Sequence, residues 1–200
     1  MVKNNINAPI VDTDIWVFLI MSGFYKRLIE YYGFLQFSDV VEKEIMRWSS
    51  NKEELKEIAL TFKKLKDEHK IKVILFDDFE NLEQKSINHQ LNEYGLREVR
   101  IIEKNKGEFT SLLYALHKGI GKFKTNDRKF VTEISEDNYD DITIINWDEM
   151  LSKYCVSFKE KIEVQKLIVN KETKMKKQRE TYQKEQRDPR WDKLEKLVGG

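Results

Sequence analysis

Four acidic residues in distant parts of the chain, each beside an apolar segment, constrain the fold more than any other feature. They are Asp12, Glu44, Glu108 and Asp127. Acidic side chains are seldom buried unless they are paired or bind a metal, and four that converge would repel one another. A divalent cation with hard oxygen ligands removes that repulsion. The pattern therefore predicts a fold that gathers these acids, and a metal-dependent hydrolase.

The residues around each acid predict a buried or half-buried position. A short apolar strand runs directly into Asp12. Glu44 lies between Val41 and Ile45, which share one face of a helix. Glu108 lies in the first turn of a helix with one apolar face. Each acid is thus expected at the edge of the core, within reach of the others.

The apolar pattern alternates between strand and helix along the chain. The expected strands are Ala8–Thr13, Phe34–Ser38, Ile71–Phe76, Ile120–Lys124 and Ile142–Asn146. The expected helices are Ile15–Tyr32, one carrying Glu44, Lys52–Glu68, Phe79–Tyr94, Gly107–His117, Arg128–Ile134 and Asp148–Tyr154. This order predicts an α/β fold with three α/β/α layers and a central, mostly parallel sheet. Asp12 and Asp127 follow strands, at the carboxyl ends where ligands bind in such sheets.

Composition divides the 200 residues into an acidic body and a basic tail. The net charge is +1 overall, but residues 159–200 carry 13 Lys/Arg against 8 Asp/Glu. We expect a domain over residues 1–157 and a charged, partly helical tail over residues 158–200. The single cysteine, Cys155, excludes an intramolecular disulfide and indicates a reducing compartment, the cytoplasm. The longest apolar run, Ile15–Met21, is too short to span a membrane.

The tail itself has three parts. Its first part carries apolar residues that can pack a helix on the body: Phe158, Ile162, Leu167 and Ile168. Apolar residues almost vanish over Asn170–Arg187, which predicts a solvated helix or a linker. Asp188–Val198 then restarts a short helix with an apolar stripe. This last helix is expected either to be a plain extension or to dock on a partner protein, a second copy of the chain or RNA.

The order of the acids resembles that of the PIN-domain nuclease family, especially its toxin-type members in bacterial toxin–antitoxin systems. The matching motifs are Val11-Asp12-Thr13, Glu44-Ile45, Gly107-Glu108 with Ser111, Ala115 and Gly119, and Thr125-Asn126-Asp127. The resemblance covers about Ala8 to Tyr154 and implies a PIN-like fold. Two positions depart from the usual pattern, because Asp14 stands where the family often has Asn and Lys129 where many members have another acid.

The resemblance implies an endoribonuclease that works with Mg²⁺ or Mn²⁺. Asp12, Glu44, Glu108 and Asp127 would be both the metal ligands and the catalytic residues. Thr125 and Asn126 would orient carboxylates or water behind them, and Asp14 would add to the site. The implied partners are an RNA substrate such as tRNA, and an inhibitor protein.

Other interpretations of the same residues remain open. Asp12-Thr13-Asp14 after a strand also fits a haloacid-dehalogenase-like phosphatase, although no glycine of this chain precedes an Asp as that family's later motif needs. A degenerate PIN domain that binds nucleic acid or acts as a scaffold is the non-enzymatic alternative. Taken one at a time, Glu44 also fits a solvated helix face, Glu108 a charge at a helix N-terminus, and Asp127 a helix cap.

Overall fold

A computed structural model describes residues 8–50, 54–103, 106–134 and 141–186 of the chain. A five-stranded, all-parallel sheet with the order β3-β2-β1-β4-β5 forms its centre. The strands are β1 (Ile10–Val11), β2 (Leu35–Ser38), β3 (Ile71–Ile74), β4 (Lys122–Lys124) and β5 (Thr143–Ile145). Strand β1 is central, so the residue that follows it, Asp12, lies at the middle of the carboxyl edge.

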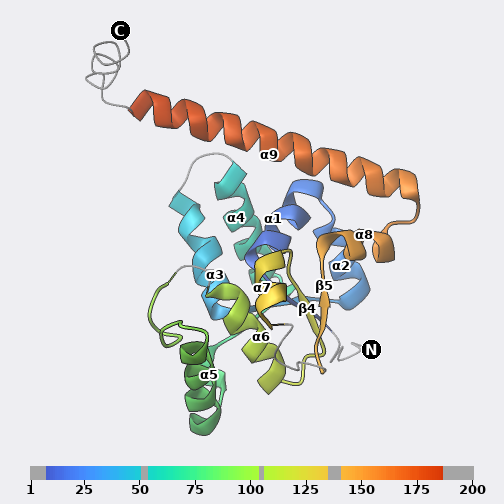
Figure 1. Ribbon diagram of the computed structural model, residues 1–200. Helices are drawn as coiled ribbons and strands as arrows, with labels where there is room; N and C mark the ends of the chain where they lie inside the picture. The colour runs from blue at the N-terminus through green and yellow to red at the C-terminus, as the bar shows by residue number, and fades with distance from the viewer. Residues whose placement is uncertain (1–7, 51–53, 104–105, 135–140, 187–200) are drawn as a thin grey trace.

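Helices cover both faces of this sheet (Figure 1). They are α1 (Thr13–Ser22), α2 (Tyr25–Tyr32), α3 (Asp39–Met46), α4 (Glu54–Asp67), α5 (Asn81–Glu93), α6 (Gly107–His117), α7 (Arg128–Ile134), α8 (Trp147–Tyr154) and α9 (Phe158–Gln186), with short 3-10 turns η1 (Arg47–Ser50) and η2 (Phe76–Asp78). One face packs on α1, α2, α4 and α8, and the other on α5, α6 and α7. This arrangement confirms the predicted α/β fold class, with a sheet that is parallel in every described pair.

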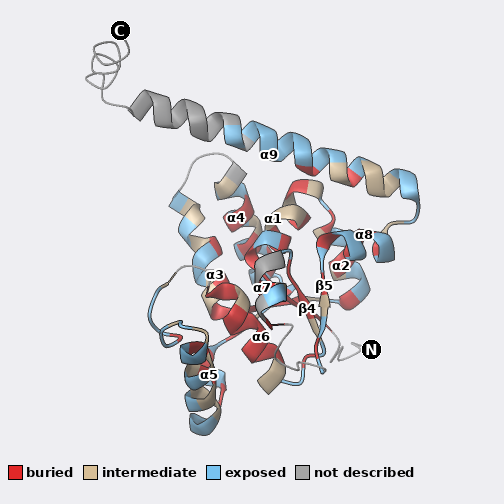
Figure 2. Cartoon of the chain, in the orientation of Figure 1, coloured by how far each residue is buried: buried red, intermediate tan, exposed pale blue. Residues whose placement is uncertain are grey.

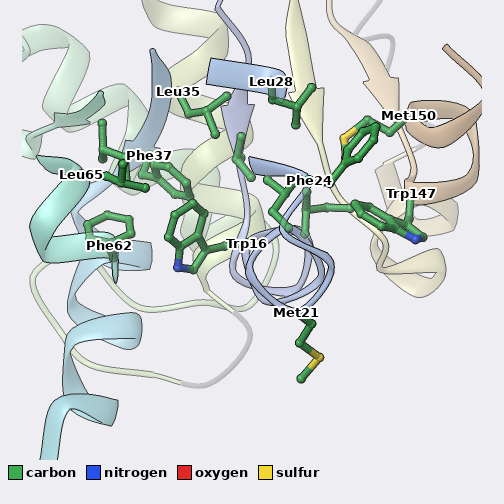
Figure 3. Packing of buried hydrophobic residues seen from close by; sticks show 14 of the residues in the cluster. Trp16, Met21, Phe24, Leu28, Leu35, Phe37, Phe62, Leu65, Trp147 and Met150 are labelled. Carbon is green, nitrogen blue, oxygen red and sulfur yellow. The ribbon is translucent and has the colours of Figure 1, made fainter. Parts of the chain in front are cut away.

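Alternation along β1 divides the core into two parts. Val11 points into the cluster under α1 and α4, whereas its neighbour Ile10 points into the cluster under α6. In the first cluster, Trp16 packs edge-on against Phe37 and Phe62, with ring centroids 5.4 and 5.5 Å away (Figure 3). Figure 2 shows the buried residues concentrated where the helices meet the sheet. The acids at the carboxyl edge therefore rest on a well-packed core.

The expected single helix over Ile15–Tyr32 is wrong. Two helices occupy this segment, because Gly23 adopts a left-handed conformation with φ of 74° and ends α1 through a bond from its N–H to the Ile20 carbonyl. Helix α1 also begins earlier than expected, at Thr13, since the Asp12 side chain caps it. The apolar run Ile15–Met21 carries no sequence signal for either end of α1.

The tail begins as one long helix, α9, which lies across the outer side of α1 (Figure 1). Val164 and Ile168 are buried in the first core cluster, whereas Phe158 and Leu167 are exposed, contrary to expectation. The helix packs through only one narrow stripe, so Phe158 and Leu167 fall on its other sides. Helix α9 continues to Gln186, and the expected helix over Asp188–Val198 lies outside the described residues.

A candidate metal-binding site of clustered carboxylates

Asp12 is the most buried of the acids. Its exposed fraction is 1%. Its Oδ1 atom accepts a hydrogen bond of 2.9 Å from the N–H of Ile15, which caps α1. Its Oδ2 atom is buried, and no described residue supplies it with a hydrogen bond. A buried carboxylate oxygen without a donor is costly, so this atom is the strongest local sign that a cation belongs here.

Glu44 comes to the site from α3 and is exposed, not half-buried as expected. Val41 and Ile45 form the buried side of α3, and Glu44 lies on the adjoining side that faces the starts of α1 and α6. Its Oε2 atom accepts a hydrogen bond of 2.8 Å from the Thr13 hydroxyl. A Cβ atom at Gly107 would lie 3.4 Å from the same oxygen, so glycine leaves room for this carboxylate beside α6.

Glu108 comes from α6, which packs beside α3, and Asp127 from the end of β4, on the other side of β1. Glu108 is half-buried in the first turn of α6. Asp127 follows β4, and its Oδ1 atom accepts a hydrogen bond of 3.1 Å from the N–H of Phe130 in α7. Asp127 therefore caps α7 through this oxygen atom. A carboxylate has two oxygen atoms, so capping does not by itself exclude metal binding.

The electrostatics link these acids to one another. Burial raises the pKa of Asp12 well above its ordinary value, and the charges of Asp14 and Glu108 add to that rise. Burial also raises the pKa of Glu108, helped by the charges of Glu44, Asp14 and Asp127. These five carboxylates therefore lie close enough for their negative charges to interact, as expected of like charges at one edge of a sheet.

Asp14 and the Thr125-Asn126 pair differ in how closely they join this group. Asp14 is exposed in the first turn of α1, and burial of its carboxyl group together with the charges of Glu44 and Asp127 raises its pKa. Thr125 is buried, its oxygen accepts a hydrogen bond of 3.2 Å from the N–H of Asp127, and its hydroxyl lowers the pKa of Asp12. Asn126 is exposed in the same turn. The side chain of Lys129 lies outside the described part of the molecule.

The cluster is loose rather than closed. Among the described side chains, no three His, Cys, Asp or Glu residues stand together in a group that could hold a metal ion as they are placed. The donors nevertheless suit a hard cation, since all are carboxylates and one buried oxygen lacks a partner.

A buried polar network fixes α3 against α6 and thereby positions Glu44 and Glu108. The Ser38 and Ser111 hydroxyls share a hydrogen bond of 2.9 Å, and the Tyr114 hydroxyl donates one of 3.0 Å to Asp39. Asp39 and Tyr114 were not among the residues predicted from the sequence. Their only signal was Ser38-Asp39 directly after a strand, in the pattern of a helix start.

A second unpaired polar atom lies close to Asp12 on the face covered by α2 and α8. Lys124 is fully buried, and its Nζ atom finds no hydrogen-bond acceptor among the described residues. This atom lies 5.3 Å from the ring centre of Tyr154 and 6.0 Å from that of Tyr32. Burial, with the nearby charges of Lys153 and Lys122, lowers the pKa of Lys124 to about 7.

The sequence matches no protein-family model and no curated protein sequence. Among solved structures, the chain is similar to one from the crystal structure of VapBC2 from Rickettsia felis bound to a DNA fragment from their promoter. The two share 17% sequence identity with a TM-score of 0.47, over 70% of this chain and 98% of that chain. Separately, no described helix is both long and apolar enough to cross a bilayer.

Proposed function

We propose that this protein is a metal-dependent endoribonuclease of the PIN type, which hydrolyses RNA phosphodiester bonds with Mg²⁺ or Mn²⁺. The observation that carries the proposal is the gathering of carboxylates at the carboxyl edge of the sheet, around a buried Asp12 oxygen without a donor. A cluster that only stabilised the fold would contain basic partners. Neighbouring acids instead raise the pKa of Asp12 and of Glu108, which suits a site that binds a cation.

Asp12, Glu44, Glu108 and Asp127 are the residues that would hold the metal, with Asp14 at the solvent side. When bound, the metal polarises a phosphate oxygen and lowers the pKa of an attacking water molecule. Thr13 fixes the Glu44 carboxylate through its 2.8 Å hydrogen bond. Thr125 helps to hold Asp12 and Asp127 close to each other, since it interacts with both residues. Asn126, in the same exposed turn, is suited to orient water or a phosphate oxygen.

Cleavage of single-stranded or looped RNA tests this function directly. We expect purified protein to cut such RNA with Mg²⁺ or Mn²⁺ and to stop in EDTA. Asp12→Asn and Asp127→Asn should each lower the rate by about a thousandfold, the scale on which removal of one essential polar group acts. Asp67→Asn, which removes an exposed acid at the end of α4, is the matched control. Full activity in the Asp12→Asn protein would exclude the proposed mechanism.

The alternatives give different outcomes in the same assay. Metal-dependent release of phosphate from a monoester, without RNA cleavage, would identify the dehalogenase-like phosphatase. That class leaves the proximity of Glu44 and Glu108 to Asp14 without a purpose. RNA binding with no hydrolysis under any metal would identify a degenerate, non-catalytic PIN domain.

The sequence motifs further suggest a toxin of a toxin–antitoxin pair, with tRNA as the first substrate class to test and an inhibitor protein as partner. Induced expression in bacteria should then arrest growth, and Asp12→Asn should abolish the arrest. Growth that is equal with both proteins would contradict a toxin role while leaving the nuclease chemistry open to the cleavage assay.

A further inference from the structure

A groove opens beside Glu44, between α3 and the segment that leads into α6. Its volume is about 410 Å³, within the usual range for pockets that hold small ligands. Lys43, Glu44 and Arg47 line one wall, Ile101 and Ile102 the other, and Gly107 lies at the end nearest the acids. Because Glu44 belongs to both the groove and the carboxylate cluster, whatever occupies the groove meets the cluster at that residue.

The wall opposite α3 is held firmly in place. Lys106 is buried, and its Nζ atom donates hydrogen bonds of 2.8 and 2.5 Å to the carbonyls of Glu98 and Ile101. The N–H of Val99 donates a 2.9 Å bond to Asn88 of α5. The N–H of Arg97 donates a 2.8 Å bond to the Glu103 carboxylate, which closes the turn. A wall tied at this many points is formed before any ligand arrives.

This rigid wall presents apolar side chains to solvent. Ile101 is 40% and Ile102 69% exposed. Burial of Ile101 and Ile102 in the core therefore does not explain why this segment is ordered. Fixed, exposed apolar side chains beside a polar site are a common feature of ligand-binding surfaces.

The facing wall carries two cations beside Glu44. Lys43 is held by an ion pair of 3.0 Å with Asp39. Arg47 is exposed, and none of the described side chains forms an ion pair with it. An unpaired guanidinium is well suited to a phosphate, because its planar N–H groups match two phosphate oxygens at once.

We infer that this groove holds one unpaired nucleotide of an RNA strand, with its phosphate on Arg47 and Lys43 and its base against Ile101 and Ile102. The strand then passes Glu44, so that a neighbouring phosphodiester reaches the carboxylates. The inference rests on the proposed function and assigns the side chains that place the single strand at the carboxylates. A base in a duplex is stacked and paired, so it cannot enter a groove between two walls.

The test measures RNA binding in EDTA, where the proposed hydrolysis cannot proceed. Fluorescence anisotropy would compare a short single-stranded RNA with the same sequence annealed to its complement. We expect the single strand to bind more tightly. Arg47→Ala should weaken its binding about tenfold, the value of one charge-assisted contact, and reduce the slope of log K against log salt by about 0.7. Arg47→Lys should recover part of the affinity.

Ile102→Ser should weaken single-strand binding about threefold and leave the salt slope unchanged, because it removes apolar contact and no charge. Two controls match these changes. Lys63→Ala removes an exposed cation from α4, and Leu82→Ser removes an exposed apolar side chain, 77% exposed, from α5. Neither control residue lines the groove, so both proteins should bind like the wild type.

Affinities unchanged in both Arg47→Ala and Ile102→Ser would overturn the inference, as would equal binding of duplex and single strand. These results are separable from a failure of the proposed function. Groove-dependent binding without metal-dependent cleavage would refute the nuclease and retain the groove. If the wild-type protein cleaves RNA and the variants bind RNA as tightly as the wild type, the nuclease function stands and the groove inference is refuted.

Discussion

Asp12, directly after β1, lies beside Lys124 at the end of β4, but the two side chains have opposite charges and different surroundings. The N–H of Asp12 donates a 3.1 Å hydrogen bond to the Lys124 carbonyl. Each side chain buries one polar atom that has no hydrogen-bond partner among the described residues, Oδ2 in Asp12 and Nζ in Lys124. The two side chains do not neutralise each other, so each region must deal with its own unpaired group.

The two surroundings explain the difference. Lys124 is enclosed by tyrosine rings and neighbouring cations, and a pKa of about 7 lets it lose its proton near neutrality. Asp12 lies at the sheet edge among other acids, two of which, Glu44 and Asp14, are exposed to solvent. A cation held by these exposed acids would come close to Asp12, whereas Lys124 is fully buried beside aromatic rings and other cations. An unpaired buried group therefore indicates ligand binding only where groups that could hold the same ligand lie beside it.

The largest effect on stability is expected from Lys124→Met. The folded-state pKa of about 7 lies below the ordinary 10.5, so the lysine's cost is full below pH 7 and disappears as the pH rises toward 10.5. Methionine fits the same space without a charge. The variant should be more stable by on the order of 2–4 kcal/mol at about pH 6, with a gain that shrinks in alkaline buffer.

Chemical denaturation at several pH values measures this gain, with Lys63→Met on exposed α4 as the control. RNA cleavage by the Lys124→Met protein should stay near the wild-type rate. A gain that is independent of pH would mean that folding does not shift the pKa of Lys124, and the contrast with Asp12 would fail.

A gain in stability is also expected from Asp12→Asn at neutral pH without metal, because burial raises the pKa of this carboxyl group. The folded-state pKa of Asp12 is raised above its ordinary 3.8, so the cost of ionisation is absent below pH 3.8 and grows as the pH rises. The pH trend is therefore the reverse of that for Lys124→Met. Thermal melts with and without Mn²⁺ give the second measurement, because metal should stabilise the wild type and not this variant. Equal stabilisation of both proteins would separate Asp12 from the metal.

The smallest effect is expected from Gly107→Ala. The new Cβ would lie 3.2 Å from Val41 Cγ2 and 3.4 Å from Glu44 Oε2, so α3 must shift by a few tenths of an ångström. We expect a loss of about 1 kcal/mol in stability and weaker metal binding, since Glu44 moves with α3. Gly121→Ala is the matched control, because its Cβ would meet only an ordinary contact of 3.6 Å. Calorimetric metal titration of both variants should separate them.

The sequence predicted the fold class because each strand and helix carries its own periodicity. Helix α6 begins and ends where the pattern indicated, at Gly107–His117, and α7 begins where it indicated, at Arg128. Helix α4, over Glu54–Asp67, lies inside the predicted Lys52–Glu68. The break at Gly23 was missed, since an apolar run continues on both sides of it and only the backbone conformation there shows the turn.

The candidate site was only partly predictable. The order of the acids indicated which carboxylates to expect, and their metal-binding role stays a prediction. Lys124 gave no signal, because a Lys-Phe-Lys strand looks like an ordinary alternation with lysines outside, and its burial depends on Tyr154 arriving from a distant helix. The groove also had no signal in the sequence, since only tertiary packing brings Arg47 and Ile102 to the same pocket.

The central position of β1 has a consequence for how the molecule opens. Strand β1 is bonded to β2 on one side and to β4 on the other, so exposing Asp12 requires both ladders to break. Amide protons of Val11 and Asp12 should therefore exchange only on near-global opening. The carboxylate on which the proposed site centres would keep its position through every smaller fluctuation of the native protein.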